Sequence, residues 1–210
     1  MSDSFVGRKG KSFQFLDDSG SPKMKLVERL GQGASGEVWL VEVTSKDGGE
    51  SLGALKVYNR RLSDNPKAER QFKTEAEFKF KDERFIQPLQ SGQITTVDGR
   101  HAILFPYIEC QQLFSYMKEN TKHPMRNRMD LVRHVAASIS QLHNRDYLHN
   151  DIKPQNLLYV DHDTKNPLRL IDFQLACPER DVDDLFGASK GRLGTEGYQA
   201  PEVLLLGARE

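Results

Sequence analysis

Short runs in which apolar and polar residues alternate fill the first half of the chain, and this period-two pattern predicts β-strands. Two runs, Lys25–Leu30 and Val38–Val43, lie on either side of a glycine cluster and predict a hairpin with a glycine-rich connection. A third strand is expected at Leu52–Tyr58, after the turn sequence Asp47-Gly48-Gly49.

A helical segment follows these strands. Residues Asn65–Lys81 are rich in Glu, Lys, Ala and Phe, and they predict a helix. Two further strands, Ile86–Thr96 and His101–Ile108, are expected around the turn Asp98-Gly99. The pattern therefore predicts an antiparallel sheet with one main helix.

The N-terminal residues 1–21 lack sustained periodicity, and we expect them to form a loose leader. Within this stretch Phe13 and Phe15 alternate with polar neighbours, a pattern compatible with a short strand.

Helical periodicity dominates the second half. A short helix is expected at Leu113–Asn120 and a longer amphipathic helix at Met129–His143. The longer helix should bury one apolar face, made by Leu131, Val135, Ile139 and Leu142. Apolar runs at Leu157–Val160 and Leu168–Ile171 predict a further hairpin. The whole pattern predicts an α+β fold, with a small antiparallel sheet lobe followed by a mainly helical lobe.

Composition narrows the class of protein. Thirty basic residues balance thirty acidic ones, so no overall field attracts nucleic acid or lipid. Cys110 and Cys177 are the only cysteines, which argues against a disulfide framework and suits a reducing compartment. No apolar run approaches the roughly eighteen residues of a membrane span. We expect a soluble, cytoplasmic protein whose oligomeric state the sequence does not indicate.

The glycine cluster Gly31-Gln32-Gly33-Ala34-Ser35-Gly36 is the first candidate site. Glycines at this spacing let the backbone approach phosphates closely and offer its N–H groups to them. The same spacing occurs in dinucleotide-binding folds, where a helix follows the glycines, whereas a strand follows them here. An ordinary glycine-containing hairpin is the remaining alternative.

A lysine in an apolar strand is the second candidate. Lys56 ends the run Gly53-Ala54-Leu55-Lys56, and a buried ammonium group is costly unless it is paired. The following helix supplies Glu75 as the partner, with Glu77 as the second choice. The alternative interpretation places Lys56 on an exposed strand surface and Glu75 on a solvated helix face.

The segment Tyr147–Leu158 carries the most specific chemistry. Phosphoryl transfer to a hydroxyl needs a carboxylate that orients the hydroxyl, a cation on the γ-phosphate and an oxygen ligand for Mg²⁺. Within six residues the chain supplies these groups as Asp151, Lys153 and Asn156. The nearby sequence His143–Asp146 has no following Lys-Pro-x-Asn and is rejected.

This segment resembles the catalytic loop of eukaryotic-like serine/threonine protein kinases, which has the form Asp-x-Lys-Pro-x-Asn. Leu170–Gln174 resembles the metal-binding Asp-Phe-Gly motif, with Gln174 at the third position, and Gly194–Glu202 resembles the end of an activation segment. The resemblance runs from Lys23 to the last residue, with all motifs in family order.

The resemblance implies a bilobal protein kinase fold. Its parts would be a leader at residues 1–21, an N-lobe at residues 22–108 and a partial C-lobe at residues 109–210, which ends just after the activation segment. The family has several further helices beyond the position of Glu210, so we expect this chain to be a C-terminally truncated fragment.

The resemblance also implies residue roles. Asp151 would orient the acceptor hydroxyl or take its proton, Lys153 would contact the transferred phosphate, and Thr195 would brace both. Asn156 and Asp172 would hold Mg²⁺. The implied contacts to ATP come from the phosphate-covering Gly31, Gly33 and Gly36, the phosphate-holding Lys56 with its partner Glu75, the adenine-contacting Val38, Ala54 and Leu158, and the pocket and linker residues Phe105, Tyr107 and Ile108.

Three positions depart from the family pattern. Asn150 stands where many members have an arginine that clamps a phosphorylated activation segment, which suggests activity without such phosphorylation, although Ser189 and Thr195 are available for modification. Gln174 replaces a flexible glycine and implies a stiffer metal-binding turn. If Glu75 is the partner of Lys56, a usually apolar position falls on Lys79.

The leading hypothesis is a kinase that transfers the γ-phosphate of ATP to Ser/Thr hydroxyls of protein substrates, with Mg²⁺. A nucleotide-binding pseudokinase, or an inactive fragment that acts as an interaction module, is the alternative. Small-molecule phosphotransferases share the Asp and Asn spacing, but Lys153-Pro154 and Gly194–Glu202 argue against them.

Overall fold

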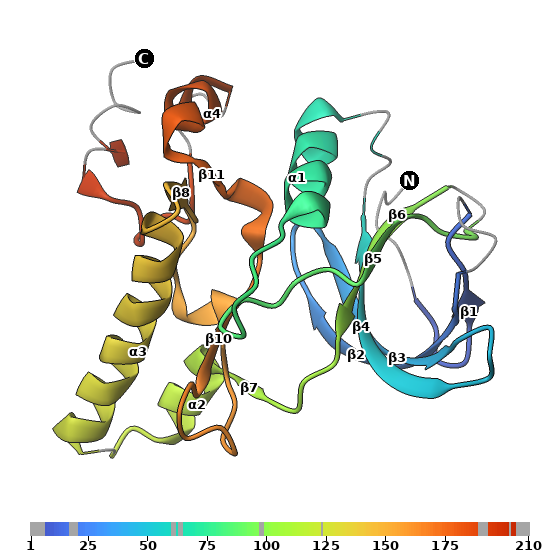
Figure 1. The fold of residues 1–210 in the computed structure, drawn as a ribbon, viewed down its shortest axis with the longest axis horizontal. Helices are drawn as coiled ribbons and strands as arrows, with labels where there is room; N and C mark the ends of the chain where they lie inside the picture. Colours follow the sequence, from blue (N-terminus) through green and yellow to red (C-terminus); the bar gives the residue numbers. More distant parts are fainter. Residues whose placement is uncertain are drawn as a thin grey trace. The chain divides into compact units, whose positions relative to one another are not determined.

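The structure is a computed structural model that describes residues 7–16, 21–59, 62, 65–96, 99–122, 124–188, 193–201 and 203–204. Three residues named in the sequence predictions lie outside the described residues: Asp98 of the expected turn, Ser189 and Glu202. The chain divides into two compact units (Figure 1). Unit 1 comprises residues 1–79 and 87–107, and unit 2 comprises residues 80–86 and 108–210.

Unit 1 is built on a six-stranded antiparallel sheet with the strand order β1-β2-β3-β4-β6-β5. Just beyond the two outer strands, Phe15 and Ile94 pair through an isolated bridge, so the sheet curls round on itself (Figure 1). The strands are β1 (Ser12–Phe13), β2 (Lys23–Gln32), β3 (Gly36–Thr44), β4 (Glu50–Tyr58), β5 (Gln90–Gln93) and β6 (His101–Pro106).

The inner face of this curled sheet holds the larger hydrophobic core. Alternate residues of β3 and β4, among them Val41 and Leu55, point into it because successive strand residues face opposite sides. Phe13 and Phe15 complete the core, with exposed fractions of 1% and 4%. The prediction of a loose leader is therefore wrong for residues 7–16, because burial of two phenylalanines fixes this segment on the sheet.

Helix α1 (Pro66–Glu77) packs on the opposite face of the sheet through a second apolar cluster that includes Tyr58, Phe72 and Ile103. The side chain of Asn65 caps the helix by accepting a hydrogen bond from the N–H of Ala68. The helix ends four residues before the predicted boundary, because Phe78 is extended and buries its side chain.

The predicted strand over residues 86–96 is reduced to β5. The N–H of Ile86 donates to the carbonyl of Leu170 within unit 2, and Pro88 has no N–H to contribute to a sheet. The chain therefore enters the sheet of unit 1 only at Gln90.

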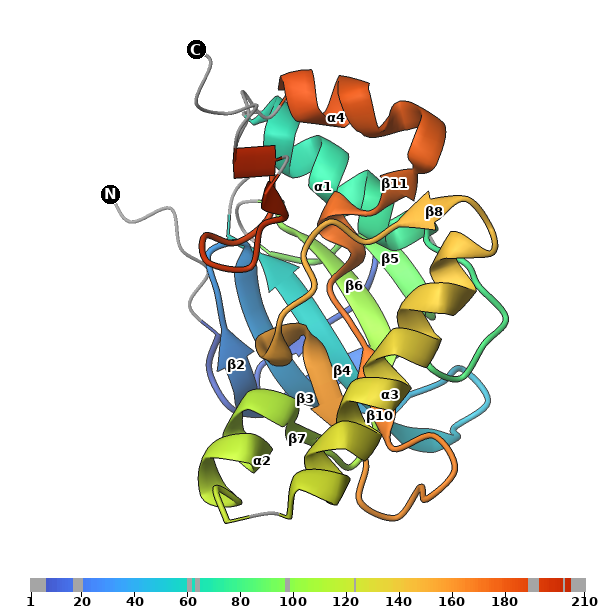
Figure 2. The ribbon, with the colours of Figure 1, turned by 90° about the vertical axis from the view of Figure 1, so that its left-hand side faces the viewer.

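Unit 2 is mainly helical, with α3 running past β8 and β10 (Figure 2). Its strands form the small antiparallel sheets β10-β9-β7 and β11-β8. The elements are β7 (Gln111–Gln112), α2 (Leu113–Glu119), α3 (Met125–His143), β8 (Tyr147–Leu148), η2 (Pro154–Asn156), β9 (Leu157–Tyr159), β10 (Leu168–Leu170), η3 (Phe173–Leu175), β11 (Cys177–Pro178), η4 (Glu179–Asp181) and α4 (Val182–Ala188), where η denotes a 3₁₀-helix.

The long amphipathic helix is present, but its apolar face is only partly covered by the described residues. Leu142 is fully buried, whereas Leu131, Val135 and Ile139 are half-buried. Three apolar residues near its start are exposed: Met125 (70%), Met129 (59%) and Val132 (60%). The α+β fold class, with one antiparallel sheet unit and one mainly helical unit, is confirmed. Within the described part of the chain, no helix has the length and apolar character needed to cross a membrane.

Candidate active site

A buried ion pair in unit 1 joins β4 to α1. The ammonium group of Lys56 lies 2.8 and 2.7 Å from the two carboxylate oxygens of Glu75. Glu75, rather than the exposed Glu77, carries this pair, because Phe72 and Glu75 share the helix face that is buried against the sheet. Two buried opposite charges at this distance satisfy each other, and removal of either would leave an uncompensated charge.

Tyr58 is a further partner of this pair that the sequence analysis missed. Its hydroxyl donates to Glu75 Oε2 at 2.6 Å. A tyrosine in a strand gives no sequence signal for such a bond, although its position two residues after Lys56 places both side chains on one face of β4.

The glycine-rich connection between β2 and β3 is tied to the end of β4. The backbone N–H of Asn59 donates to the carbonyl of Ser35 at 2.9 Å, and its side-chain amide lies 3.4 Å from the carbonyl of Gly33. A Cβ atom added at Gly36 would lie 2.1 Å from the carbonyl oxygen of Val57, so only glycine fits there. Asn59 is a second residue that the sequence analysis missed.

The other two glycines have a different environment. A Cβ added at Gly31 or Gly33 would meet nothing within 4 Å. The backbone at these positions is therefore open, as a surface that receives a phosphate group must be.

The residues expected around adenine divide between the two units. In unit 1, Val38 pairs with Lys56 and Ala54 pairs with Phe105 across the sheet. Because directly opposite strand residues point to the same side, these four side chains share one face. Three further residues were expected near the adenine ring. Tyr107 is the last residue of unit 1, Ile108 is the first residue of the second segment of unit 2, and Leu158 lies in β9 of unit 2.

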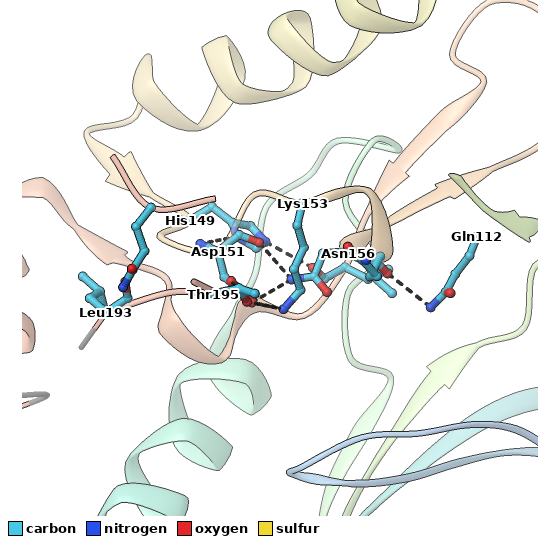
Figure 3. A network of polar contacts seen from close by, with 10 residues as sticks. Gln112, His149, Asp151, Lys153, Asn156, Leu193 and Thr195 are labelled. Atoms are coloured by element: carbon cyan, nitrogen blue, oxygen red, sulfur yellow. Dashed lines mark hydrogen bonds and ion pairs between the residues drawn. The ribbon is translucent and has the colours of Figure 1, made fainter. Parts of the chain in front are cut away.

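The hydrogen-bond network of unit 2 is centred on Asp151 (Figure 3). Asp151 Oδ1 accepts from the hydroxyl of Thr195 at 2.6 Å, and Oδ2 accepts from the ammonium group of Lys153 at 2.7 Å. Lys153 also donates to the hydroxyl oxygen of Thr195 at 2.6 Å, which closes a three-membered network. The structure thus brings together a carboxylate, a cation and a hydroxyl that are up to 44 residues apart in sequence.

Two residues with left-handed backbone conformations lie where the segment of Thr195 approaches the loop of Asp151. Asn150 has φ 63°, and Gly194 has φ 86°. A Cβ at Gly194 would lie 2.7 Å from the carbonyl oxygen of Asn150, so the close approach of the two segments requires glycine.

Asn150 makes its own connection to the segment that follows the Asp172-Phe173-Gln174 motif. Its side-chain amide donates to the carbonyl of Leu175 at 2.9 Å and to Cys177 Sγ at 3.3 Å. The antiparallel pairing of β8 with β11 supports the same connection. This segment is therefore held by neutral hydrogen bonds at the position where many kinases carry an arginine.

His149 links the loop of Asp151 to the residue before Asp172. Its Nδ1 accepts from the N–H of Asp151 at 3.2 Å, so its Nε2 carries the proton and donates to the carbonyl of Ile171 at 3.1 Å. Burial lowers the pKa of His149, which keeps the ring neutral.

Asn156 and Asp172 lie at the same end of the β9–β10 hairpin. Asn156 immediately precedes the paired residue Leu157, and the N–H of Ile171 donates to the carbonyl of Asn156 at 3.0 Å. The side-chain amide nitrogen of Asn156 donates to Asp151 Oδ2 at 3.0 Å and to its carbonyl at 2.9 Å, so the amide oxygen is the atom that remains for a cation.

These donors fit Mg²⁺. The ion prefers oxygen ligands and keeps waters or substrate phosphates beside one or two protein carboxylates. Among the described residues, no three His, Cys, Asp or Glu side chains gather into a metal site of protein ligands alone. The Asn156 amide oxygen and the Asp172 carboxylate supply the oxygen ligands that Mg²⁺ prefers. The other coordination positions would be left to waters and substrate phosphates.

The family model of the protein kinase domain matches residues 24–210, so the chain belongs to the protein kinase family. This result confirms the family that the sequence motifs indicated. The matched region contains the Lys56–Glu75 pair and the Asp151 network.

Several curated proteins are similar to this chain. A calcium/calmodulin-dependent protein kinase type 1 from Macrobrachium nipponense is 28% identical over 188 residues, which cover 87% of this chain and 50% of that protein. The serine/threonine-protein kinase CG17528 of Drosophila melanogaster is 35% identical over 105 residues, 49% of this chain and 13% of that protein. The calcium/calmodulin-dependent protein kinase cmkA of Emericella nidulans is 34% identical over 94 residues, 45% of this chain and 22% of that protein. The chain thus spans half the length of these relatives or less.

Proposed function

We propose that the protein transfers the γ-phosphate of ATP to serine or threonine hydroxyls of protein substrates, with Mg²⁺ as cofactor. The observation that carries this proposal is the network in which Asp151 holds Lys153 and Thr195 within 2.7 Å. A carboxylate with a fixed cation beside it supplies both the proton acceptor and the charge stabilisation that phosphoryl transfer requires.

Asp151 accepts the proton of the substrate hydroxyl as the new phosphate ester bond forms and the bond between the γ-phosphate and ADP breaks, so that ADP leaves. Its carboxylate has about four lone-pair sites, and the bonds from Thr195, Lys153 and Asn156 leave capacity for one more donor. Those bonds fix the orientation of the carboxylate before the substrate arrives. Lys153 places its positive charge beside the reacting hydroxyl, where negative charge develops on the transferred phosphoryl group.

Unit 1 contributes to ATP binding. Lys56 donates to the α- and β-phosphates while Glu75 fixes its position, and the open backbone at Gly31 and Gly33 covers the phosphates. Val38, Ala54 and Phe105 offer apolar surface to the adenine ring.

Asn156 and Asp172 would hold Mg²⁺, which neutralises phosphate charge when it is bound. The hydrogen bonds from Asn156 to Asp151 connect this pair to the reacting carboxylate, so the two functions share one loop.

A cytoplasmic location and a protein partner with a Ser/Thr acceptor belong to the same proposal. Cys110 and Cys177, both among the described residues, form no disulfide, which suits a reducing compartment. The balance of thirty basic and thirty acidic residues gives no reason to expect nucleic-acid binding.

The test is transfer of label from γ-labelled ATP to a generic Ser/Thr protein substrate in the presence of Mg²⁺. Asp151→Asn should lower kcat by about 10²- to 10⁴-fold, because the amide does not accept the proton. ATP binding, measured by titration calorimetry, should persist. Asp146→Asn is the matched control, because Asp146 is an exposed acid just before the loop and lies outside the network.

Transfer by Asp151→Asn within tenfold of the wild-type rate would contradict the assigned role. If the wild-type protein binds ATP but labels no substrate, the protein is a nucleotide-binding module and the proposal fails.

A further inference from the structure

The carboxylate of Glu75 is shared by two donors from the same strand. Lys56 approaches both oxygens, and the hydroxyl of Tyr58 donates to Oε2 at 2.6 Å. Tyr58 and Glu75 are each 2% exposed, so this bond is shielded from competing water. The proposed reaction gives a role to Lys56 and Glu75 but none to Tyr58.

Packing fixes the position of the Tyr58 ring. Its ring meets that of Phe72 from α1 edge to face, at 5.4 Å between centroids and 85° between planes. The ammonium group of Lys56 also lies over this ring, 5.6 Å from its centroid. These contacts hold the ring against α1 and direct its hydroxyl at the Glu75 carboxylate.

The two donors differ in what else they can do. In the proposed reaction Lys56 also donates to phosphates, so its bonds to Glu75 weaken when ATP binds. A buried carboxylate that loses donors is costly, and α1 would be free to move away from β4. The tyrosine hydroxyl is uncharged and buried, so ATP does not compete for it.

We propose that Tyr58 is a positioning residue, whose hydroxyl keeps Glu75, and with it α1, against β4 independently of Lys56. The effect on catalysis rests on the proposed function, whereas the effect on α1 does not. Tyr58 therefore lets Lys56 serve the nucleotide without release of the helix.

The first experiment is hydrogen exchange of the α1 amides in Tyr58→Phe, which keeps the ring and its contact with Phe72. The hydroxyl bonds a charged group, and loss of such a bond should speed α1 exchange by about tenfold or more. Tyr116→Phe is the matched control. Its ring stacks on that of Tyr159 in unit 2, so this variant, which also removes only a hydroxyl group, should leave α1 exchange unchanged.

If the α1 amides of Tyr58→Phe exchange hydrogen at the wild-type rate, the proposal is overturned. A uniform rise throughout the β2–β6 sheet would also overturn it, because the hydroxyl would then support the unit as a whole rather than the helix.

The second experiment separates the two donors. In Lys56→Met, α1 should stay partly protected because Tyr58 still donates to Glu75. Addition of Tyr58→Phe to this variant should speed α1 exchange by a further factor of about ten. Equal exchange in the single and double variants would show that the hydroxyl does not act independently of Lys56.

Kinetics give the catalytic consequence. Tyr58→Phe should raise the KM for ATP about fivefold, while the KM for the protein substrate stays the same, because a loosened α1 disturbs the Lys56–Glu75 pair that holds the phosphates. An equal rise in both constants would contradict the positioning role. If wild-type protein transfers no phosphate while α1 exchange still responds to Tyr58→Phe, the proposed function fails and the positioning role stands.

Discussion

Each unit holds a lysine against a carboxylate, but the two pairs are positioned by different means. In unit 1, Lys56 and Glu75 lie near the C-terminal ends of strand β4 and helix α1, and their side chains are 10% and 2% exposed. In unit 2, Lys153 and Asp151 lie in a loop two residues apart, with exposed fractions of 18% and 9%. The first pair depends on one packed interface between α1 and β4, whereas the second depends on several separate hydrogen bonds.

This difference predicts two kinds of response to substitution. A change at the interface of unit 1 affects helix docking and stability together, because burial and pairing are coupled there. A change in the unit 2 network removes one bond of several and affects orientation more than stability. Four substitutions or conditions test this contrast.

The largest effect is expected for Lys56→Met, which leaves Glu75 buried without its cation. We expect kcat/KM to fall by about 10³-fold, together with a loss of roughly 3 kcal/mol in the stability of unit 1. Steady-state kinetics and urea unfolding followed by tryptophan fluorescence measure both, since the single Trp39 lies in unit 1. Unchanged turnover would show that the assignment of Lys56 is wrong.

A smaller effect, confined to activity, is expected for Thr195→Val. The variant keeps the shape of the side chain but removes the hydroxyl that joins Asp151 to Lys153, so we expect kcat to fall by about 10²-fold. The urea midpoint should stay within experimental error. Thr195→Ser is the control, because it keeps the hydroxyl and should retain most of the activity. A marked loss of stability in Thr195→Val would remove the contrast between the two units.

Asn150→Gly should have a weaker effect still. Glycine tolerates the left-handed backbone at this position, so the variant removes only the amide bonds to Leu175 and Cys177. We expect about a fivefold loss of activity and faster hydrogen exchange around β11.

Wild-type activity should be unchanged after phosphatase treatment, because a neutral amide holds this segment. A tenfold loss on phosphatase treatment would contradict that interpretation.

The smallest effect concerns pH. Burial lowers the pKa of His149 in the folded protein, while the unfolded chain takes up a proton near pH 6.5. The stability from neutral His149 is therefore fully present above pH 6.5 and is lost as pH falls from there toward the lowered pKa. The free energy of unfolding, measured by urea titration between pH 7.5 and 5.5, should decline by less than about 1.4 kcal/mol per pH unit from this residue. His149→Asn should flatten that decline, whereas the exposed His143→Gln should not.

Much of unit 1 could be predicted because its pattern repeats with a simple period. Alternation predicted β2, β3 and β4, and the three-residue spacing of Phe72 and Glu75 contains the information that favours Glu75 over Glu77. The hydroxyl bond of Tyr58 could not be predicted, because it depends on how one ring packs against α1. Phe13 and Phe15 did alternate with polar residues, but a stretch so short did not predict their burial in the core.

In unit 2 the motifs predicted which residues matter, while the backbone that arranges them was not accessible from sequence. Asn150 and Asp172 adopt left-handed backbone conformations that no motif in the sequence indicated. The start of α3 at Met125 was missed by four residues, although Pro124 is a helix-start signal in the sequence.

The closure of the curled sheet has a consequence for how the protein emerges from the ribosome. The hairpins of β2, β3 and β4 can form as soon as each is synthesised, because their partners are neighbours in sequence. The segment around Phe15 has no such neighbour: the N–H of Gln14 donates to the side chain of Thr95, 81 residues later. β1 can pair early with β2, its neighbour in sequence, but at about 5–20 residues per second the bridge from Phe15 to Ile94 can form only roughly 4–16 s after Phe15 is synthesised. Until that bridge forms the curled sheet cannot close, so the part of the core that Phe15 shares with Ile94 is completed only after β5 has been synthesised.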